Sequence, residues 1–492
     1  MHDSEHGRGE APDSLGQAPV AEYAATAAFF DSFAPVAERW SRRNRHYHRL
    51  IAAVYRFHVP AGERVLEVGS GDGALLAALE PSRGLGIDVS GGMVEEARRR
   101  HPELEFRVGA GEEFATDERF DTIVLSDVVP FVHDILALFE GLRAVSHART
   151  RVIVNAHSQA WRPVLRLAER LRLKPAKPAR NWVSPTDVAN LLHLAGWEVV
   201  TTSRRILMPK RVPLLEPFLN RVVANVWPFS SLCLTYWLVA RPVPDPTEEE
   251  LSVTVVCPCR NERGHVAEIV RRVPRLGRAT ELVFVEGGSS DGTREEIERH
   301  LGSRPDLELR LVDQPGTGKG DAVRAGFAVA RNDVLMILDG DLSVAPEELP
   351  KFYDALVQGR GEFVNGSRLV YDLEPGAMRF LNLLGNKAFG RLLAFALGQH
   401  VKDTLCGTKV LLRSDYERIA AGRAIFGDFD PFGDFDLLLG AGRLGLRIVD
   451  LPVRYQARVY GTTNINRFSD GFLLLRMTLF AFRRFKMRIY RT

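Results

Sequence analysis

The sequence has few cysteines, and they are not arranged as a disulfide framework or a zinc site would require. Its 492 residues include only Cys233, Cys257, Cys259 and Cys406. Both kinds of site need repeated cysteine pairs at close spacing. We therefore expect free thiols and a reducing, cytoplasmic compartment.

A leader peptide and a long apolar run are also lacking. The N-terminus reads "MHDSEHGRGEAPDSLGQAPV", with no basic start followed by an apolar stretch, which predicts a disordered lead-in over residues 1–25. The most apolar window, residues 222–240, is interrupted by Asn225, Pro228 and two serines. This window predicts a loop and a buried strand rather than a bilayer-spanning helix.

No excess of charge marks the chain as a whole. It has 65 lysines and arginines against 62 acidic residues, and no basic stripe with interleaved aromatics, so no nucleic-acid partner is expected. The exception is residues 471–492, where six basic residues alternate with Phe and Leu without an acid. They predict a basic amphipathic helix that either lies on the inner face of a membrane, as a peripheral contact, or packs on the rest of the protein.

The length of the chain predicts two domains, because single cores stop growing at about 250–300 residues. The stretch "RPVPDPTEEEL", residues 241–251, combines three prolines with three glutamates, as linkers do. On both sides of it, strand-like runs alternate with helix-like runs, which predicts an α/β fold with a parallel sheet in each half. We place the domains at residues 26–242 and 252–470, joined by residues 243–251 and followed by the C-terminal helix.

A glycine-rich loop follows the first strand-like run. In "VLEVGSGDGALLAAL", residues 65–79, Gly69, Gly71 and Gly73 precede a helix start. Glycines there allow a sharp turn and a close approach of the backbone to a ligand. Asp88 ends the next strand about 20 residues on, where a carboxylate can accept two ribose hydroxyls. The two features predict a nucleotide-type cofactor.

The same region resembles the class I S-adenosylmethionine-dependent methyltransferases, which have a Rossmann-like fold. The resemblance extends over about residues 40–242 and rests on E-x-G-x-G-x-G, "VGAGEEF", "FDTIVLSDVVPFVHD" and "RVIVNAHSQAW". It implies S-adenosylmethionine as cofactor, with the glycines and Glu67 beside its amino-acid part and Asp88 on the ribose. It places Glu112 along the adenine, and Ser126 and Asp127 at the methyl-transfer site.

Methyl transfer to a hydroxyl needs a base as well as alignment of the reactants. The candidates are His133, His157 and Asp127. The alternative is that this half has lost its activity and serves as a scaffold or regulatory module.

The second half contains a strand that ends in two carboxylates. In "MILDGDLSV", residues 336–344, Asp339 and Asp341 flank Gly340. Side chains two residues apart on a strand share a face, and carboxylate oxygens suit Mg²⁺ or Mn²⁺. A divalent cation neutralises the charge that develops when a nucleoside diphosphate leaves. The motif predicts a cation site, and the family that this half resembles implies that the cation serves a nucleotide-sugar donor.

The order of motifs from residue 252 to about 470 resembles the family 2 glycosyltransferases of the GT-A fold. "SVTVVCPCRNE", "ELVFVEGGSSDGT", "QPGTGKGDAVRAGFAVA" and "DVLMILDGDLSV" follow one another. The resemblance implies an inverting, metal-dependent transfer, with Asp339 and Asp341 at the metal and Arg458 near the donor phosphates. The residues it implies for donor binding are Pro258, Asn261, Glu262, Glu286, Asp291, Lys319 and Asp339.

Residues 365–414 resemble the subgroup that glycosylates polyprenyl or dolichyl phosphates. The resemblance rests on Arg368, Arg379, Asn386 and the run from Asp403 to Lys409. It implies that the two arginines and Lys409 bind the acceptor. Arginines near an apolar helix suit a phosphate on a lipid tail.

A phosphate acceptor needs little help from a base, whereas a hydroxyl acceptor needs one. In the second case Asp434 or Asp436 is the candidate. In the first, Asp403 and Asp436 would organise the loop and the cation. Taken together, the sequence predicts a bifunctional transferase of a cell-envelope glycan or glycolipid pathway, or else a glycosyltransferase with an inactive methyltransferase-like domain.

Overall fold

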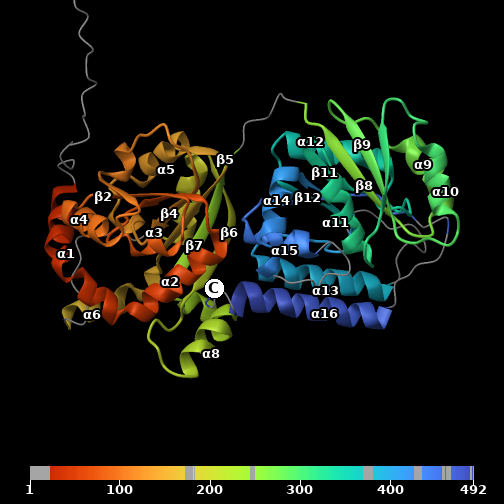
Figure 1. The fold of residues 1–492 in the computed structure, drawn as a ribbon. Coiled ribbons are helices and arrows are strands. Elements are labelled where there is room, and N and C mark those ends of the chain that lie inside the picture. The colour runs from red at the N-terminus through yellow and green to blue at the C-terminus, as the bar shows by residue number, and fades with distance from the viewer. Residues whose placement is uncertain are drawn as a thin grey trace, which may run out of the picture.

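The computed structural model describes residues 23–171, 181, 183–243, 250–368, 380–425, 435–456, 460, 467–487 and 490. They form two α/β domains that lie side by side, each built on a seven-stranded sheet (Figure 1). The prediction of two α/β domains is confirmed.

The first sheet has the strand order β3-β2-β1-β4-β5-β7-β6. Strands β3, β2, β1, β4 and β5 are parallel, and β7 runs antiparallel to both of its neighbours. The strands are β1 (Arg64–Val68), β2 (Arg83–Asp88), β3 (Glu105–Val108), β4 (Phe120–Ser126), β5 (Ser146–His157), β6 (Trp197–Arg205) and β7 (Thr235–Pro242).

Eight helices accompany this sheet in the described part of the chain. They are α1 (Ala24–Arg43), α2 (Arg45–His58), α3 (Ala74–Ala78), α4 (Gly91–Arg100), α5 (Ile135–Ala144), α6 (Arg162–Arg170), α7 (Pro185–Leu194) and α8 (Leu215–Arg221). The caps follow from the sequence: the Ser90 hydroxyl accepts from the backbone N–H of Met93 at the start of α4, and Ser184 and Asp187 form a capping box at α7.

The second sheet has the order β10-β9-β8-β11-β13-β12-β14, in which β13 runs antiparallel to both neighbours. Its strands are β8 (Val253–Cys259), β9 (Thr280–Glu286), β10 (Glu308–Asp313), β11 (Val334–Ile337), β12 (Phe363–Ser367), β13 (Lys409–Leu412) and β14 (Ile448–Pro452). Its helices are α9 (Arg263–Arg272), α10 (Thr293–His300), α11 (Lys319–Val329), α12 (Leu349–Val357), α13 (Phe380–Leu397), α14 (Arg413–Ala421), α15 (Phe435–Arg443) and α16 (Arg467–Phe482).

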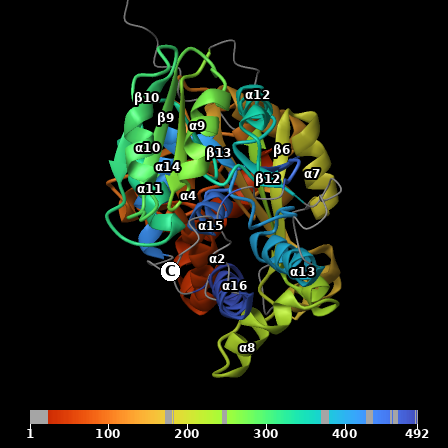
Figure 2. The ribbon, with the colours of Figure 1, turned by 90° about the vertical axis from the view of Figure 1, so that its right-hand side faces the viewer.

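The structure can be compared with the predictions for the apolar window, the C-terminal helix and the cysteines. Residues 222–240 contain the short turns Val223–Asn225 and Phe229–Leu232 and then β7, as the sequence predicts. Helix α16 starts before residue 471 and continues as the π-helical turn Arg483–Met487. It packs along α13 (Figure 2). Within the described residues, no helix is both long and apolar enough to cross a bilayer. The four cysteines are free and buried.

A continuous apolar core joins the two domains. One cluster of buried side chains includes Tyr55 and Trp237 of the first domain as well as Leu397 and Leu438 of the second. At the junction, the ring of Phe57 meets that of Phe485 edge to face, with centroids 5.1 Å apart.

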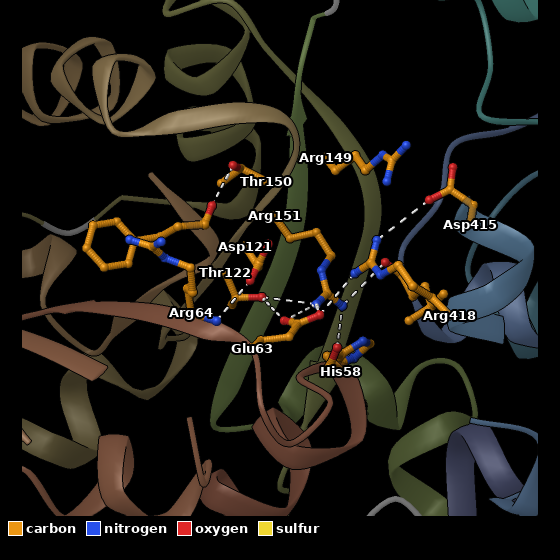
Figure 3. A network of polar contacts seen from close by, with 12 residues as sticks. His58, Glu63, Arg64, Asp121, Thr122, Arg149, Thr150, Arg151, Asp415 and Arg418 are labelled. Carbon is orange, nitrogen blue, oxygen red and sulfur yellow. Dashed lines mark hydrogen bonds and ion pairs between the residues drawn. The ribbon is translucent and has the colours of Figure 1, made fainter. Parts of the chain in front are cut away.

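A buried carboxylate in the first domain also binds the second (Figure 3). Glu63 pairs with Arg151 (Nη2 to Oε1, 2.5 Å), accepts from the hydroxyl of Thr122 at 2.7 Å, and accepts from Nη2 of Arg418 at 2.9 Å. Arg151 also donates to the backbone oxygen of Leu444, across the domain boundary, at 3.4 Å. One carboxylate therefore balances two guanidinium groups from different domains.

More charged pairs bridge the junction. Arg241 of β7 pairs with Glu362, and Arg447 pairs with Glu198. Burial lowers the pKa of Arg241 to about 9, with Asp415 opposing that shift and Arg151 adding to it. The domains also approach closely at Gly398, where a Cβ atom would lie 2.5 Å from the hydroxyl oxygen of Thr201. The junction is thus packed like an interior.

We expect Glu63→Ala to lower the free energy of unfolding by about 3–5 kcal/mol, because it leaves the buried guanidinium of Arg151 without its counter-charge and removes one of the two acidic partners of Arg418. The measurement is denaturant unfolding of the full chain. The control is Glu268→Ala, which removes an exposed pair with Arg271 and should have a much smaller effect. Equal losses in the two variants would contradict the role assigned to Glu63.

Candidate functional site

The first candidate site lies at the carboxyl edge of the first sheet. Strand β1 pairs with β2 on one side and β4 on the other. The strand order therefore reverses between β1 and β4, and ligands commonly bind beyond the carboxyl ends of strands at such a point. The glycine loop follows β1, Asp88 ends β2, and Ser126 ends β4. Topology therefore brings together the residues that the sequence predicted for the cofactor.

Asp88 holds the glycine loop. Its carboxylate accepts from the backbone N–H groups of Gly71 and Ser90, both at 2.9 Å. Gly69, Gly71 and Gly73 all have positive φ. A Cβ atom on Gly69 would lie 2.5 Å from a methyl carbon of Val128. The loop therefore requires glycine, because its positive φ angles disfavour other residues and a side chain at Gly69 would clash with Val128.

Glu67 is a buried acid at this site. Its Oε2 atom has no hydrogen-bond partner among the described residues, and the side chain lines the cavity. Burial raises the pKa of Glu67 well above its usual range, and the nearby carboxylate of Asp72 raises it further. An unsatisfied buried carboxylate is costly unless a ligand completes it.

Helix α1 covers the cavity, which the sequence did not lead us to expect. Asp31 accepts from the Ser90 hydroxyl at 2.6 Å and from the Gly92 N–H at 2.8 Å. Tyr23, at the end of the predicted lead-in, is buried and donates to Glu112. The signal was present in the sequence, since Phe30 and Phe33 recur at a helical spacing and line the cavity.

Glu112 lines the cavity and also accepts hydrogen bonds from other parts of the protein. Its Oε1 atom accepts from the backbone N–H groups of His133 and Asp134, both at 3.2 Å. Gly111 beside it is buried, and a Cβ atom there would lie 2.7 Å from Val68. Glu112 therefore fixes the segment after β4 as well as lining the site predicted for adenine.

Asp127, which follows β4, is the centre of a polar cluster. It adopts a positive φ of 53°. Its carboxylate accepts from the Tyr47 hydroxyl at 3.0 Å and from the Asn155 amide at 3.2 Å, and lies 3.2 Å from Nδ1 of His157. The Tyr47 and His157 rings stack, with centroids 6.1 Å apart. Of the two candidate histidines, His157 lines the cavity, whereas His133 is exposed.

The cavity has a volume of about 970 Å³ and is lined mainly by apolar groups. It runs from the glycine loop past Asp127 to Leu165, Pro209 and Leu234. Such a volume can hold a nucleoside cofactor and part of a second molecule. The residues present fit S-adenosylmethionine, because the unpartnered Glu67 oxygen and the glycine loop lie where its amino-acid part would bind.

The second candidate site lies at the carboxyl edge of the second sheet. There β8 pairs with β9 on one side and β11 on the other, and α/β proteins commonly bind ligands at the carboxyl end of such a strand arrangement. Pro258 is near the end of β8, Glu286 ends β9, and Asp339 follows β11. The two sites therefore occupy equivalent positions in the two sheets.

Asp339 and Asp341 emerge beside the loop of residues 403–409. Lys319 lies 2.6 Å from Oδ1 of Asp339. A Cβ atom on Gly407 would lie only 2.0 Å from the other carboxylate oxygen, so glycine there lets the loop meet Asp339. Gly340 packs on β8, where a Cβ atom would lie 2.9 Å from the Pro258 carbonyl.

The chemistry of this donor set suits a hard cation shared with a substrate. Within the described residues, no cluster of three or more metal-ligating side chains is present. Mg²⁺ is commonly held by one or two carboxylates together with substrate phosphates. Asp339 and Asp341 fit that pattern if the donor diphosphate completes the coordination.

The residues that we predict to bind the nucleotide form hydrogen bonds within the loops at this edge of the sheet. Asn261, with a positive φ of 57°, accepts from the Ser290 N–H at 2.9 Å, and Glu286 accepts from the Ser289 N–H at 2.6 Å. Asp291 accepts from the Arg263 N–H at 3.2 Å. Glu262 is buried beside His265, with 2.8 Å between Oε2 and Nδ1.

Arg368 and Lys409, which we predict to bind the acceptor, both contact the loop of residues 403–409. Arg368 binds Asp403 through two nitrogens, Nε at 2.7 Å and Nη2 at 2.9 Å. Burial acts to raise the pKa of Asp403, but Arg368 outweighs it and the pKa is lowered. Lys409 is fully buried and donates to the carbonyl of Cys406. Both cations therefore order the loop of residues 403–409.

Asp436, at the start of α15, is buried between two arginines. Nε of Arg423 is 3.1 Å and Nη1 of Arg324 is 3.9 Å from its Oδ2. Neither arginine was predicted, because no motif marks them and only the packing of α11 and α15 brings them together. Asp434, Arg379 and Arg458 lie outside the described residues.

Comparison with known proteins identifies both halves. A family model described as glycosyl transferase family 2 matches residues 254–420, and one described as a methyltransferase domain matches residues 39–202. A solved structure of an S-adenosylmethionine-dependent methyltransferase from Thermotoga maritima is 18% identical, with a TM-score of 0.35, over 44% of this chain and 99% of that one.

Two curated relatives come from Haloferax volcanii. The glycosyltransferase AglJ is 31% identical over 47% of this chain and 70% of its own length. A dolichyl-phosphate hexose transferase is 30% identical over 44% of this chain and 89% of its own length. The chain is therefore a transferase that belongs to the family 2 glycosyltransferases, and its residues 39–202 match a methyltransferase domain.

Proposed function

We propose that the chain is a bifunctional enzyme. Its first domain transfers a methyl group from S-adenosylmethionine, and its second transfers a sugar from a nucleotide-sugar, with a divalent cation, to a polyprenyl phosphate or a glycan acceptor. The observation that supports this most is that both sheets gather their acids and glycines at the carboxyl edge, where the strand order reverses.

The first domain supplies a place for each part of the cofactor. Glu67 would take the cationic amino group, and Asp88 the ribose hydroxyls. S-adenosylmethionine, when bound, supplies an electrophilic methyl group. The role of the protein is to align an acceptor in the apolar part of the cavity and to exclude water from it, which helix α1 does.

We assign the base to His157. Its Nδ1 faces Asp127, so the carboxylate can orient the ring and stabilise the imidazolium that forms, which leaves Nε2 to take a proton from the acceptor. Tyr47 and Asn155 hold Asp127 in turn. The assignment concerns acceptors with a hydroxyl, the class that needs a base.

In the second domain, Asp339 and Asp341 would hold a cation that offsets the charge of the departing diphosphate. Lys319, 2.6 Å from Asp339, supplies a further positive charge beside it. The loop of residues 403–409, fixed by Arg368, closes against Asp339 at Gly407. These contacts support the proposal, because they would hold the charged groups of a donor site in position before a substrate binds.

The surroundings of Asp436 favour a phosphate acceptor over a hydroxyl. Two arginines contact its carboxylate, so a hydroxyl acceptor would compete with them for it. A phosphate oxygen is already anionic and needs no base. Arg324 and Arg423 also add positive charge near the donor site, which an anionic acceptor would need.

We expect the full chain to bind S-adenosylmethionine, and Asp88→Asn to weaken that binding by about tenfold or more, because one charged hydrogen bond is worth about 1.5–3 kcal/mol. Isothermal calorimetry measures this. Glu95→Gln, on the exposed face of α4, is the control and should bind as the wild type does. No binding by the wild type would indicate that the first domain is a scaffold.

We expect His157→Gln to lower methyl transfer by about 100-fold or more, the usual contribution of a general base, while leaving cofactor affinity unchanged. The rate is followed as label passing from methyl-labelled S-adenosylmethionine into a lipid-linked saccharide extract, over a range of pH. His133→Gln is the matched control, since His133 is exposed. The reverse pattern in the two variants would rule out His157.

We expect nucleotide-sugar turnover to require Mg²⁺ or Mn²⁺, to stop with a chelator and to return when the metal is restored. Asp341→Asn should lower turnover by at least about 100-fold, since it removes the electrostatic stabilisation of the leaving group. Asp354→Asn, on α12, is the control. Unchanged turnover in Asp341→Asn would contradict the metal assignment.

A further inference from the structure

Exposed apolar side chains gather at one end of the molecule. Helices α8, α13 and α16 lie at this end in both views, and Figure 1 shows α6 there too (Figures 1 and 2). We call this region the basal surface and define it as residues 162–171, 207–234, 385–397 and 472–487. The first two segments belong to the methyltransferase domain. The last two lie on α13 and α16, on the glycosyltransferase side of the chain.

The basal surface is continuous across the two domains. The indole N–H of Trp161, just before α6, donates to the carbonyl of Leu232 at 2.7 Å. Helix α8 contacts the π-helical turn that ends α16, and α13 packs along α16, where the rings of Phe395 and Phe482 stack with centroids 6.1 Å apart. A partner could therefore contact all four segments at once.

More apolar side chains are exposed in this region than the isolated ones found on most protein surfaces. Leu214 is 88% and Trp227 is 83% exposed. On α16, Phe472, Leu475 and Leu479 share one face, at helical spacing, and are exposed. Other exposed apolar residues of the basal surface are Val164, Leu167, Leu171, Leu215, Phe218, Val226, Phe229, Leu232, Leu392 and Phe395. A continuous apolar area of this kind marks an interaction site.

The charge of these segments indicates the chemistry of the partner. The four segments of the basal surface together contain 12 lysines and arginines and two acidic residues, in a chain with nearly equal numbers overall. Of these, Glu216 is buried against Asn220, and Lys486 is buried as well. Apolar side chains surrounded by basic ones match the interface of an anionic bilayer.

The methyltransferase cavity opens beside this surface. Leu165 of α6 and Pro209, Lys210 and Leu234 of the second segment line the cavity. A lipid-anchored acceptor could therefore reach the cavity from a bilayer that touches the basal surface. A soluble protein partner would have no comparable reason to lie at the cavity entrance.

We propose that the basal surface docks on an anionic membrane, with Trp227 and Leu214 entering the headgroup region and the arginines contacting lipid phosphates. The contact includes both domains, so it involves more than the C-terminal helix alone. It goes beyond the two transfer activities and does not depend on either.

The test is co-sedimentation of the full chain with vesicles of phosphatidylcholine alone and of phosphatidylcholine mixed with phosphatidylglycerol. We expect tighter binding to the mixed vesicles, weakened by added salt. The triple variant Leu214→Ser, Phe218→Ser, Trp227→Ser should lower the partition coefficient by about tenfold or more, because three apolar anchors are lost. The control, Leu194→Ser with Leu301→Ser, removes exposed leucines elsewhere and should bind as the wild type does.

A second variant, Arg211→Glu with Arg483→Glu, keeps the apolar residues and should lose only the preference for anionic vesicles. Equal binding by the triple variant and its control would overturn the proposal. So would the absence of vesicle binding together with a dimer, seen by light scattering, that the triple variant converts to a monomer. Calorimetry with S-adenosylmethionine on the same preparations separates failure of this proposal from failure of the proposed function.

Discussion

The arrangement of the molecule depends on one buried carboxylate. Glu63 lies just before β1, in the first domain, and balances Arg151 of β5 and Arg418 of α14. Taking two guanidinium groups out of water is costly unless an anion accompanies them. Because Arg418 comes from the second domain, the interaction that completes the first core also fixes the relative position of the domains. The edge-to-face pair of Phe57 and Phe485 adds apolar contact at the same junction.

A fixed junction has consequences for function. The two candidate sites lie at the carboxyl edges of different sheets, so each would bind its own substrates. The helices of both domains contribute to the basal surface. Two separate enzymes joined by a long flexible linker would not share one surface. The arrangement suits the two transfer reactions and the membrane docking that we propose, because a rigid junction would raise the effective concentration of a shared substrate at both sites.

The sequence predicted the two α/β domains, and it predicted that the residues we propose for the cofactors lie near strand ends, because both depend on local order: a strand, then glycines, then a helix, and an acid at the next strand end. Asp88 and the Asp339 to Asp341 pair belong to that class. The sequence did not predict Arg324 and Arg423 around Asp436, or helix α1 over the cavity, because these depend on packing between distant segments. It assigned Arg368 to an acceptor, whereas pairing with Asp403 could be seen only in three dimensions.

For the second domain we propose that the acceptor is a phosphate, because two arginines engage the Asp436 carboxylate that a hydroxyl acceptor would need as its base. The most direct measurement is mass spectrometry of the product formed from a nucleotide-sugar, Mn²⁺ and polyprenyl phosphate in vesicles. The account predicts a polyprenyl phosphate carrying one sugar through a phosphodiester bond. Transfer only to a sugar hydroxyl, with polyprenyl phosphate left unchanged, would contradict it.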